Sequence, residues 1–453
     1  MKYQAYDEYK ESCITWIGKV PNHWYPIRFK HVLLEKKKTS NAELDAGSIS
    51  FGNVIYKNSD NLSVETKDSY QEVLSGEFLI NPLNLNYDLL SLRTALSKIN
   101  VVVSTGYIVL KSNNRLVKNY VRWLLQEFDV AHMKTLGSGV RQTINYSDIG
   151  NSFFFQPSQE EQFTIANFLD NETTKIDTLI EKQQQLIKLL KEKRQAVISH
   201  AVTKGLNPNV HMRDSGVEWL GIVPEHWSVY KLKHIITSLE SGVSVNAADS
   251  PAYGDELGVL KTSCVYTRSF RVEENKTVLK EEENRVKCPI RKGAIIISRM
   301  NTPDLVGASA LVEVDDTNIY LPDRLWQTIF ASNIKLNPKF ISFFMMIKGF
   351  RNQISLAAEG ASSSMQNIAK DDYLSINITL PDIAEQDVIV SHLENKLGYF
   401  QKLEESANKA ILLIQERRTA LISAAVTGKI DVRNWQAPEP LHSNNEISKE
   451  EAA

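Results

Sequence analysis

The sequence predicts an α+β protein in which two mixed α/β domains are separated by a long antiparallel two-helix coiled coil with pseudo-two-fold symmetry. Two repeats in the chain predict this arrangement. The segment Trp16–Trp24 returns as Trp219–Trp227, at a spacing of 203 residues. The segment 193–203 returns as 417–427, at a spacing of 224 residues. Each half therefore has a fixed beginning, a variable middle and a fixed end.

The variable middle of each half has the pattern of short strands with one helix. Apolar, β-branched runs between turn residues predict strands at 76–80, 107–110, 293–298 and 326–330. Helical periodicity predicts a helix near 117–128 and another near 338–347. Because the two repeat spacings differ by 21 residues, the second middle carries an insertion, which surface loops accommodate at little cost.

The fixed ends predict two long helices. Ser158, with Glu161 three residues later, is typical of the capping box that begins a helix. One heptad position has the same register in both helices. Its members are Leu169, Ile176, Gln183, Leu190 and Val197 in the first helix, and Leu393, Phe400, Ala407, Ile414 and Leu421 in the second. We assign its partner position to Leu179, Leu186 and Leu403.

The shared register favours one coiled coil over two unrelated amphipathic helices that cover separate cores. Gln183 would then lie near Ala407, where a polar side chain fixes the register. The resulting division of the chain is a first domain at 1–157, a first helix at 158–204, a linker and second domain at 205–381, a second helix at 382–428, and a tail at 429–453. The polar, acidic composition of the tail predicts partial disorder.

Composition limits the class of protein. Of 453 residues, 42% are hydrophobic and 23% are charged, which is ordinary for a globular chain. We find no run of about 18 apolar residues and expect no membrane span. Three cysteines without a CxxC pair argue against a disulfide framework and predict a reducing, cytoplasmic location. The net charge of −2 is a weak footprint for a chain that binds DNA without partners.

The repeated motifs resemble the specificity subunits of type I restriction-modification systems over nearly the whole chain. The resemblance is carried by the Trp-x-Gly-x-x-Pro-x-x-Trp openings, by Glu161-Gln162 and Glu385-Gln386, and by the Ile-Ser-x-Ala-Val-Thr endings. It implies two target-recognition domains held apart by two conserved antiparallel helices. It also implies three kinds of partner: double-stranded DNA, two methyltransferase subunits, and motor-nuclease subunits in the full complex. Cys13 and Thr15 depart from the second half, which has Gly216 and Glu218 there.

The sequence offers little that could catalyse a reaction. It has no GxxxxGK[ST] phosphate loop, and its nine histidines are scattered. Asn81-Pro82-Leu83-Asn84 lacks the second proline and the aromatic residue of an amino-methyltransferase motif, and we expect it to end a strand. His23 and His226 are expected to be packed structural residues. We therefore predict a non-catalytic subunit without cofactor or metal.

Two polar loops before the long helices, 137–145 and 360–368, are the best candidates for reading DNA. Glycines allow close backbone approach, and arginine and glutamine can read guanine and adenine edges. The candidates in these loops are Arg141, Gln142, Thr143, Ser363, Ser364 and Gln366. The alternative is an ordinary exposed turn. Weaker candidates, each of which is more often a solvated charge or a phosphate contact, are Lys36, Lys37, Lys38, Arg93, Lys261, Arg299, Asn301 and Arg324.

Because the two middles differ, the resemblance implies a bipartite, asymmetric DNA target. Two other functions stay open at this point. One is a single-chain modification enzyme that fuses methyltransferase and nuclease, against which the missing cofactor and nucleotide motifs argue. The other is a coiled-coil scaffold that joins two protein-binding domains, for which the two different polar loops have no evident use.

Overall fold

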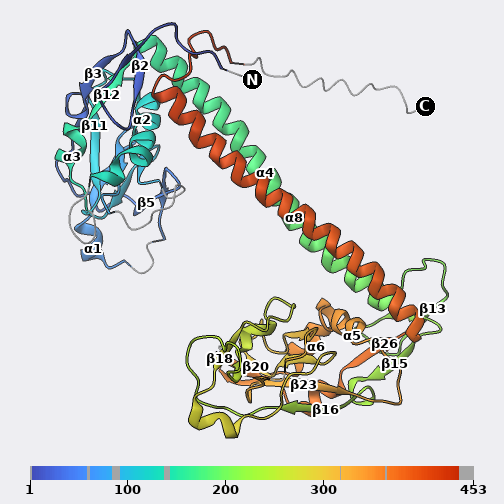
Figure 1. Cartoon of the computed structure of the whole chain (residues 1–453). Coiled ribbons are helices and arrows are strands. Elements are labelled where there is room, and N and C mark those ends of the chain that lie inside the picture. The colour runs from blue at the N-terminus through green and yellow to red at the C-terminus, as the bar shows by residue number, and fades with distance from the viewer. Residues whose placement is uncertain are drawn as a thin grey trace, which may run out of the picture. The chain divides into compact units, whose positions relative to one another are not determined.

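A computed structural model describes residues 3–58, 62–83, 92–136, 143–316, 318–362 and 365–437 (Figure 1). The chain divides into two compact units. The first unit comprises Met1–Gln183 and Lys409–Ala453, and the second comprises Gln184–Asn408. The boundaries fall inside the two long helices, so each unit contains one stretch of each helix. With helices and strands mixed in both units, the fold is α+β, as predicted.

The first unit is built on a six-stranded mixed sheet in the order β4-β11-β8-β9-β6-β5. Its strands are β4 (Leu33–Glu35), β5 (Gly47–Ser50), β6 (Asn53–Tyr56), β8 (Phe78–Ile80), β9 (Thr94–Leu96) and β11 (Ile108–Ser112). β7 (Gln71–Val73) and β10 (Val101–Val103) form a separate antiparallel pair. The helices of this middle are α1 (Val64–Asp68) and α2 (Lys118–Ala131). Phe78, Trp123 and Phe128 are fully buried in the main core, which joins α2 to the sheet.

The second unit carries a four-stranded antiparallel sheet in the order β16-β23-β19-β21. Its strands are β16 (Ile236–Ser241), β19 (Ile295–Ser298), β21 (Ser309–Leu311) and β23 (Leu325–Phe330). Two smaller sheets contain β17 (Gly258–Leu260), β18 (Asn275–Thr277) and β22 (Ile319–Tyr320), and β20 (Met300–Asn301), β24 (Glu359–Ser362) and β25 (Met365–Asn367). The helices of this middle are α5 (Pro338–Met345) and α6 (Lys348–Ala357). The strands and helices expected in both middles are thus confirmed to within a few residues.

Around these different middles, the same strand pairs occur in both units. β1 (Tyr9–Glu11) pairs with β2 (Lys19–Pro21), as β13 (Met212–Asp214) pairs with β14 (Ile222–Pro224). β3 (Tyr25–Arg28) pairs with β12 (Phe153–Gln156), as β15 (Ser228–Lys231) pairs with β26 (Asn377–Leu380). The helices α3 (Tyr146–Asn151) and α7 (Lys370–Ser375) precede β12 and β26. We call these repeated elements, with the long helices, the frame.

The long helices α4 (Gln159–Lys204) and α8 (Ile383–Val426) lie within a residue or two of their predicted ends. The capping box is present, because the amide of Ser158 donates to Oε2 of Glu161 at 3.2 Å and the amide of Glu161 donates back to Oγ of Ser158 at 3.2 Å. In each unit a stretch of α4 lies beside a stretch of α8 (Figure 1). Arg418 pairs with Asp177 at 2.9 Å in the first unit.

The first heptad position of the predicted seam is largely buried. Leu169, Ile176, Leu190, Leu393, Ala407 and Leu421 are buried, and Gln183, Val197, Phe400 and Ile414 are half-buried. In the first unit, Leu169 and Ile176 share a core with Leu421. In the second unit, half-buried Val197 packs on the core that holds Leu393.

Our assignment of the partner position was wrong for the first helix. Leu179 and Leu186 are 49% and 41% exposed. The second buried row follows the first by four residues rather than three, and its members are Thr173, Ile180, Ile187, Arg194 and Ala201, each buried or half-buried. On a helix, residues three apart and residues four apart both lie on the same face. We therefore assigned the partner row to the leucines three residues after the first row, whereas the buried residues lie four after it. In α8, Leu403 is half-buried.

Candidate nucleic-acid interface

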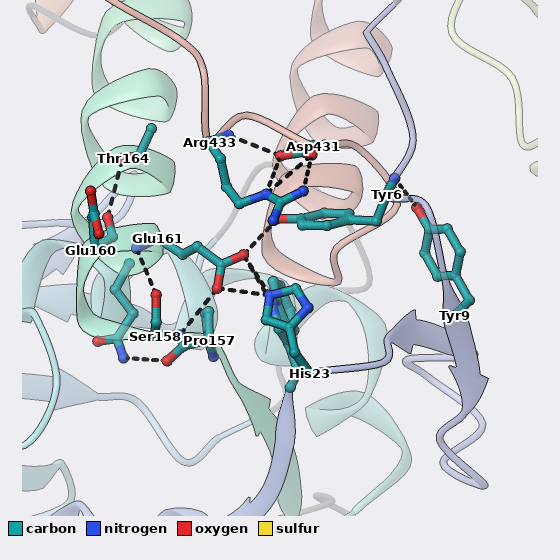
Figure 2. A network of polar contacts seen from close by, with 12 residues as sticks. Tyr6, Tyr9, His23, Pro157, Ser158, Glu160, Glu161, Thr164, Asp431 and Arg433 are labelled. Carbon is teal, nitrogen blue, oxygen red and sulfur yellow. Dashed lines mark hydrogen bonds and ion pairs between the residues drawn. The ribbon is translucent and has the colours of Figure 1, made fainter.

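In the first unit, one carboxylate ties the start of α4 to the repeated opening (Figure 2). Glu161 is only 5% exposed. Its contacts are Nε2 of His23 at 3.0 Å, the hydroxyl of Tyr6 at 3.2 Å, Nε1 of Trp24 at 3.4 Å and the amide of Ser158 at 3.2 Å. Burial and the charge of Glu161 raise the pKa of Tyr6, so the phenol keeps its proton and donates. A buried carboxylate with this many donors fixes structure.

The second unit repeats this junction in a simpler form. Oε2 of Glu385 lies 2.8 Å from Nε2 of His226 and accepts from Nε1 of Trp227 at 3.1 Å. The side chain of Glu385 is 27% exposed, whereas that of Glu161 is 6% exposed. His226 and its counterpart His23 therefore each pair with a carboxylate at the start of a long helix, as expected of structural residues, but they are not packed: their side chains are 48% and 45% exposed.

In the first unit, the segment that follows α8 also contacts the residues around Glu161. Arg433 pairs with Asp431 at 2.7 Å, and its guanidinium lies 4.9 Å from the ring centre of Tyr6 (Figure 2). The amide of Asp431 donates to the carbonyl of Gln4 at 2.8 Å. Within the first unit, the residues that follow the second long helix thus pack on the beginning of the chain.

The second unit gathers several predicted DNA-reading residues around β20 and β25. Asn301 on β20 pairs with Gln366 on β25. The carbonyl of Arg299 accepts from the amide of Ile368 at 3.1 Å, and the amide of Arg299 donates to the carbonyl of Arg324 at 3.1 Å. Residues that lie up to 69 positions apart in the sequence are therefore held side by side by main-chain hydrogen bonds.

Polar atoms in this group lack partners among the residues that the structure describes. Nε of Arg299 and Oε1 of Gln366 are buried and make no hydrogen bond there. Nδ2 of Asn301 donates to the hydroxyl of Tyr266 at 2.7 Å, which links the group to the turn that carries Arg268. Buried polar atoms are usually paired, so this site has unused capacity to bind a polar ligand. Amide and guanidinium groups are the ones that read base edges in the major groove.

Known proteins with a similar sequence are specificity subunits of type I restriction enzymes. The chain is 26% identical over 293 residues to the EcoKI type I restriction enzyme specificity subunit of Escherichia coli K12, covering 63% of this chain and 59% of that protein. It is 23% identical over 233 residues to the StySPI specificity subunit of Salmonella potsdam, covering 50% and 48%. Residues 224–412 match the family model described as a type I restriction modification DNA specificity domain.

Residues 224–412 therefore carry a type I restriction modification DNA specificity domain, and the chain as a whole is similar to specificity subunits of these systems. Its alignment spans about three-fifths of the length of the EcoKI specificity subunit. Two solved structures share the fold at 14% identity. One, on complex assembly and conformational transition of the type I R-M system, has a TM-score of 0.66 and covers 91% of this chain and 99% of its own. The HsdS subunit from Thermoanaerobacter tengcongensis has a TM-score of 0.51 and covers 93% and 100%.

Two predicted DNA contacts form buried ion pairs in the first unit instead. Lys36 is 9% exposed, and its Nζ lies 2.9 Å from Glu77 and 3.1 Å from Glu72. Arg93 is 6% exposed, and its Nε donates to Asp129 at 2.7 Å. Because both cations are already neutralised inside the protein, neither is free to meet a phosphate, and we withdraw both as DNA contacts.

The remaining predicted DNA contacts are spread over both units. Lys38 is exposed, and its Nζ donates to the carbonyl of Thr105 at 2.9 Å. Thr143 is exposed and bridges Leu83, just beyond β8, which ends at Ile80 as expected. Lys37 and Arg324 are exposed, and Lys261 is half-buried. Arg141, Gln142, Ser363, Ser364, Asn84 and the tail from 438 onward lie outside the described residues.

Sequence reasoning missed two arginines of the second unit. Arg268 lies in the turn after a 3₁₀ helix (Thr262–Val265), and Arg351 lies on α6. Burial lowers the pKa of Arg268, and burial with the nearby charge of Arg268 lowers the pKa of Arg351 to about 10. The two residues are 83 positions apart and belong to no shared motif, so no pattern in the sequence signals that they come together.

No helix among the described residues is both long and apolar enough to cross a membrane. No group of three or more His, Cys, Asp or Glu side chains among them is arranged to hold a metal ion.

Proposed function

We propose that the chain is the DNA sequence-specificity subunit of a type I restriction-modification complex and reads a bipartite, asymmetric target. The observation that carries the proposal is a repeated frame around two different middles. Strand pairs and helix starts recur in both units, whereas the sheets inside them differ in strand number and order. Two different DNA-recognition domains, held by equivalent frame elements, suit a DNA target with two different half-sites.

In this proposal, residues 1–157 and 205–381 form the two target-recognition domains, and 158–204 and 382–428 are conserved spacer helices. The helices pair as an antiparallel coiled coil, and the halves are related by pseudo-two-fold symmetry. The contacts of α4 with α8 inside each unit support the pairing. Arg418 meets Asp177 in the first unit, and Lys191 meets Glu404 at 3.4 Å in the second.

The long helices are the proposed docking surface for two methyltransferase subunits. Both carry large apolar side chains that face outward, and exposed apolar surface of this kind marks protein interaction sites. These side chains are Phe163, Leu179, Leu186, Leu189, Val388, Tyr399, Leu412 and Leu413. Motor-nuclease subunits would join the complex formed in this way. The chain itself is proposed to be non-catalytic and to need no cofactor, in keeping with relatives that are named specificity subunits.

The proposed DNA-reading residues lie in the two middles. In the second unit they are Arg299, Asn301, Arg324 and Gln366, with Lys261 and the loop residues Ser363 and Ser364. In the first unit they are Lys38, Arg141, Gln142 and Thr143. The grouping of β20 with β25, and the unpaired Oε1 of Gln366, support the second set. Base contacts by such side chains specify sequence, and phosphate contacts position the protein.

An exchange of middles tests the proposal. Residues 33–144 are replaced by the matching segment of another family member, and the methylated motif is read by genome-wide methylation sequencing of a host that carries the complex. We expect one half of the motif to change and the other half to stay. The matched control exchanges residues 236–368, and we expect the opposite half to change. A motif in which both halves change after either exchange would contradict the proposal.

A further inference from the structure

Arg268 and Arg351 both lie near the segment 301–304: Tyr266, two residues before Arg268, accepts from Nδ2 of Asn301 at 2.7 Å, and Arg351 contacts Asp304. The side chain of Arg268 makes no hydrogen bond or ion pair with any described residue, and its Nη1 is buried. Nη2 of Arg351 donates to the carbonyl of Asp304 at 3.3 Å, while its Nη1 is buried without a partner in the described part of the chain. Each guanidinium therefore has unused donors.

The surroundings of the pair favour an anion. Tyr373 is fully buried, and the charges of Arg351 and Arg268 both act to lower its pKa against the effect of burial. The ring centre of Tyr373 lies 6.0 Å from those of Trp326 and Phe350, so this tyrosine has aromatic neighbours. Asp304 is the carboxylate whose charge raises the pKa of Arg351, and its side chain is exposed. Like charges such as those of Arg268 and Arg351 repel each other, and a bound anion would offset the repulsion.

The backbone of Arg268 is also held in an unfavourable conformation. Its φ is +63°, in the left-handed region that residues with a Cβ rarely adopt. The amide of Arg268 donates to the carbonyl of Val265 at 3.1 Å, which fixes the turn. Strained residues of this kind cluster at binding sites, where the surrounding structure holds them in place.

We propose that Arg268 and Arg351 together bind one phosphodiester group of the DNA target, beside the base-reading residues Asn301 and Gln366. The inference rests on the proposed function and adds two residues and a ligand to it. Guanidinium groups present several N–H donors in a plane that matches phosphate oxygens. The hydrogen bond of Asn301 to Tyr266, two residues before Arg268, connects the phosphate site to β20. A phosphate held there would fix the register of the bases that β20 and β25 face.

The test measures DNA binding by the complex of the full chain with its methyltransferase subunits. The duplexes carry either the motif found by methylation sequencing or a scrambled motif, and the affinity is followed as salt is raised. We expect R268Q and R351Q each to lower the slope of log affinity against log salt by about 1 and to leave the ratio of target to scrambled affinity nearly unchanged. The control is R285Q, since Arg285 is 58% exposed and already paired with Glu282.

Replacing single phosphates by neutral methylphosphonates gives the sharper readout. We expect one linkage to weaken binding by the wild type and to have no effect on R351Q. Thermal unfolding separates this role from a structural one: removing an unpaired like charge leaves the melting temperature unchanged or raises it, whereas loss of a structural arginine lowers it. Stabilisation of the wild type by inorganic phosphate, without any change in DNA binding by the variants, would indicate a site for free anions and overturn the inference.

The two proposals fail in different ways. If the wild-type complex binds target and scrambled duplexes equally well, the proposed function is wrong. If the wild-type complex discriminates between them, and R268Q and R351Q keep the salt slope and methylphosphonate pattern of R285Q, the function stands and the phosphate site is wrong.

Discussion

Lys10 in the first unit and Arg213 in the second occupy equivalent places, 203 residues apart, and bind the same kind of group. Nζ of Lys10 donates to the carbonyl of Trp24 at 2.6 Å, and Nη2 of Arg213 donates to the carbonyl of Trp227 at 2.7 Å. The side chains differ, but the main-chain acceptor is conserved between the units. Contacts to the main chain thus hold the frame even where side chains have diverged.

The glutamines at the starts of the long helices show the same principle. Nε2 of Gln162 donates to the carbonyl of Pro157 at 3.0 Å, and Nε2 of Gln386 donates to that of Pro381 at 2.9 Å. The Oε1 atoms of the same glutamines accept main-chain amides from the middles, from Val117 at 2.9 Å and from Asn337 at 2.8 Å. Each glutamine therefore joins a middle to the frame without requiring a particular side chain there.

The middles, in contrast, use their charged residues differently. In the first unit, Lys36 and Arg93 are buried in ion pairs with carboxylates. In the second, Arg268 and Arg351 are half-buried and form no ion pair with a described carboxylate; unpaired donors alone do not distinguish them, because Nη1 and Nη2 of Arg93 also lack partners among the described residues. The comparison teaches that residue type alone does not mark a DNA contact: an arginine serves the fold where a carboxylate faces it and is available to a ligand where none does.

The largest expected effect comes from lengthening the frame and leaving both middles intact. A seven-residue heptad is inserted after Gln183 in α4 and after Asn408 in α8. Seven helical residues add about 10 Å, which is roughly three base pairs at about 3.4 Å each. We expect methylation sequencing to show both half-sites unchanged and the gap between them longer by that amount. An unchanged gap would show that the paired helices do not set the spacing.

The second-largest effect is expected at the carboxylates that begin the two long helices, Glu161 and Glu385. E161A leaves the buried donors of Tyr6 and Trp24 unpaired, so we expect it to cost about 3 kcal/mol of unfolding free energy. E385A removes fewer contacts from a more exposed site, and we expect a cost of about 1 kcal/mol. Urea unfolding, with hydrogen exchange to report on each unit, measures both. E160A, on the exposed face of the same turn, is the control. Equal costs for the two variants would refute the difference between the junctions.

The smallest effect concerns the ion pairs between the long helices. Arg418 and Asp177 are 25% and 49% exposed, and the guanidinium also lies 5.9 Å from the ring centre of Trp123. Lys191 and Glu404 are 64% and 27% exposed at a longer distance. Double-mutant cycles should give a coupling of about 0.5–1 kcal/mol for the first pair and about 0.2 kcal/mol for the second, because solvent screens both. A stronger second pair would reverse this ranking.

Local signals in the sequence predicted most of the frame. The capping residues Ser158 and Glu161 and the first heptad row were found because helix starts and heptads depend on neighbouring residues. Leu179 and Leu186 were placed wrongly because spacings of three and four residues both keep side chains on one helix face. The local pattern could not choose between the two; the observed packing does.

The candidate site was harder to predict because its residues meet only through the fold. Gln366 became a candidate because it repeats Gln142 at a spacing of 224 residues. The burial of Lys36 depends on Glu77, 41 positions away, and the pairing of Arg93 depends on Asp129, 36 positions away. Ion pairs between distant residues leave no periodic pattern, so sequence reasoning counted both cations as free.

The division of the chain into units has a consequence for its synthesis. The first unit needs the residues from Lys409 onward, whereas the second is complete at Asn408. In the first unit, a Cβ at Gly428, just past α8, would lie 3.1 Å from the Trp24 ring, so a segment that is synthesised late packs directly on one that is synthesised early. The second unit, although translated later than most of the first, is therefore the one whose full sequence emerges first.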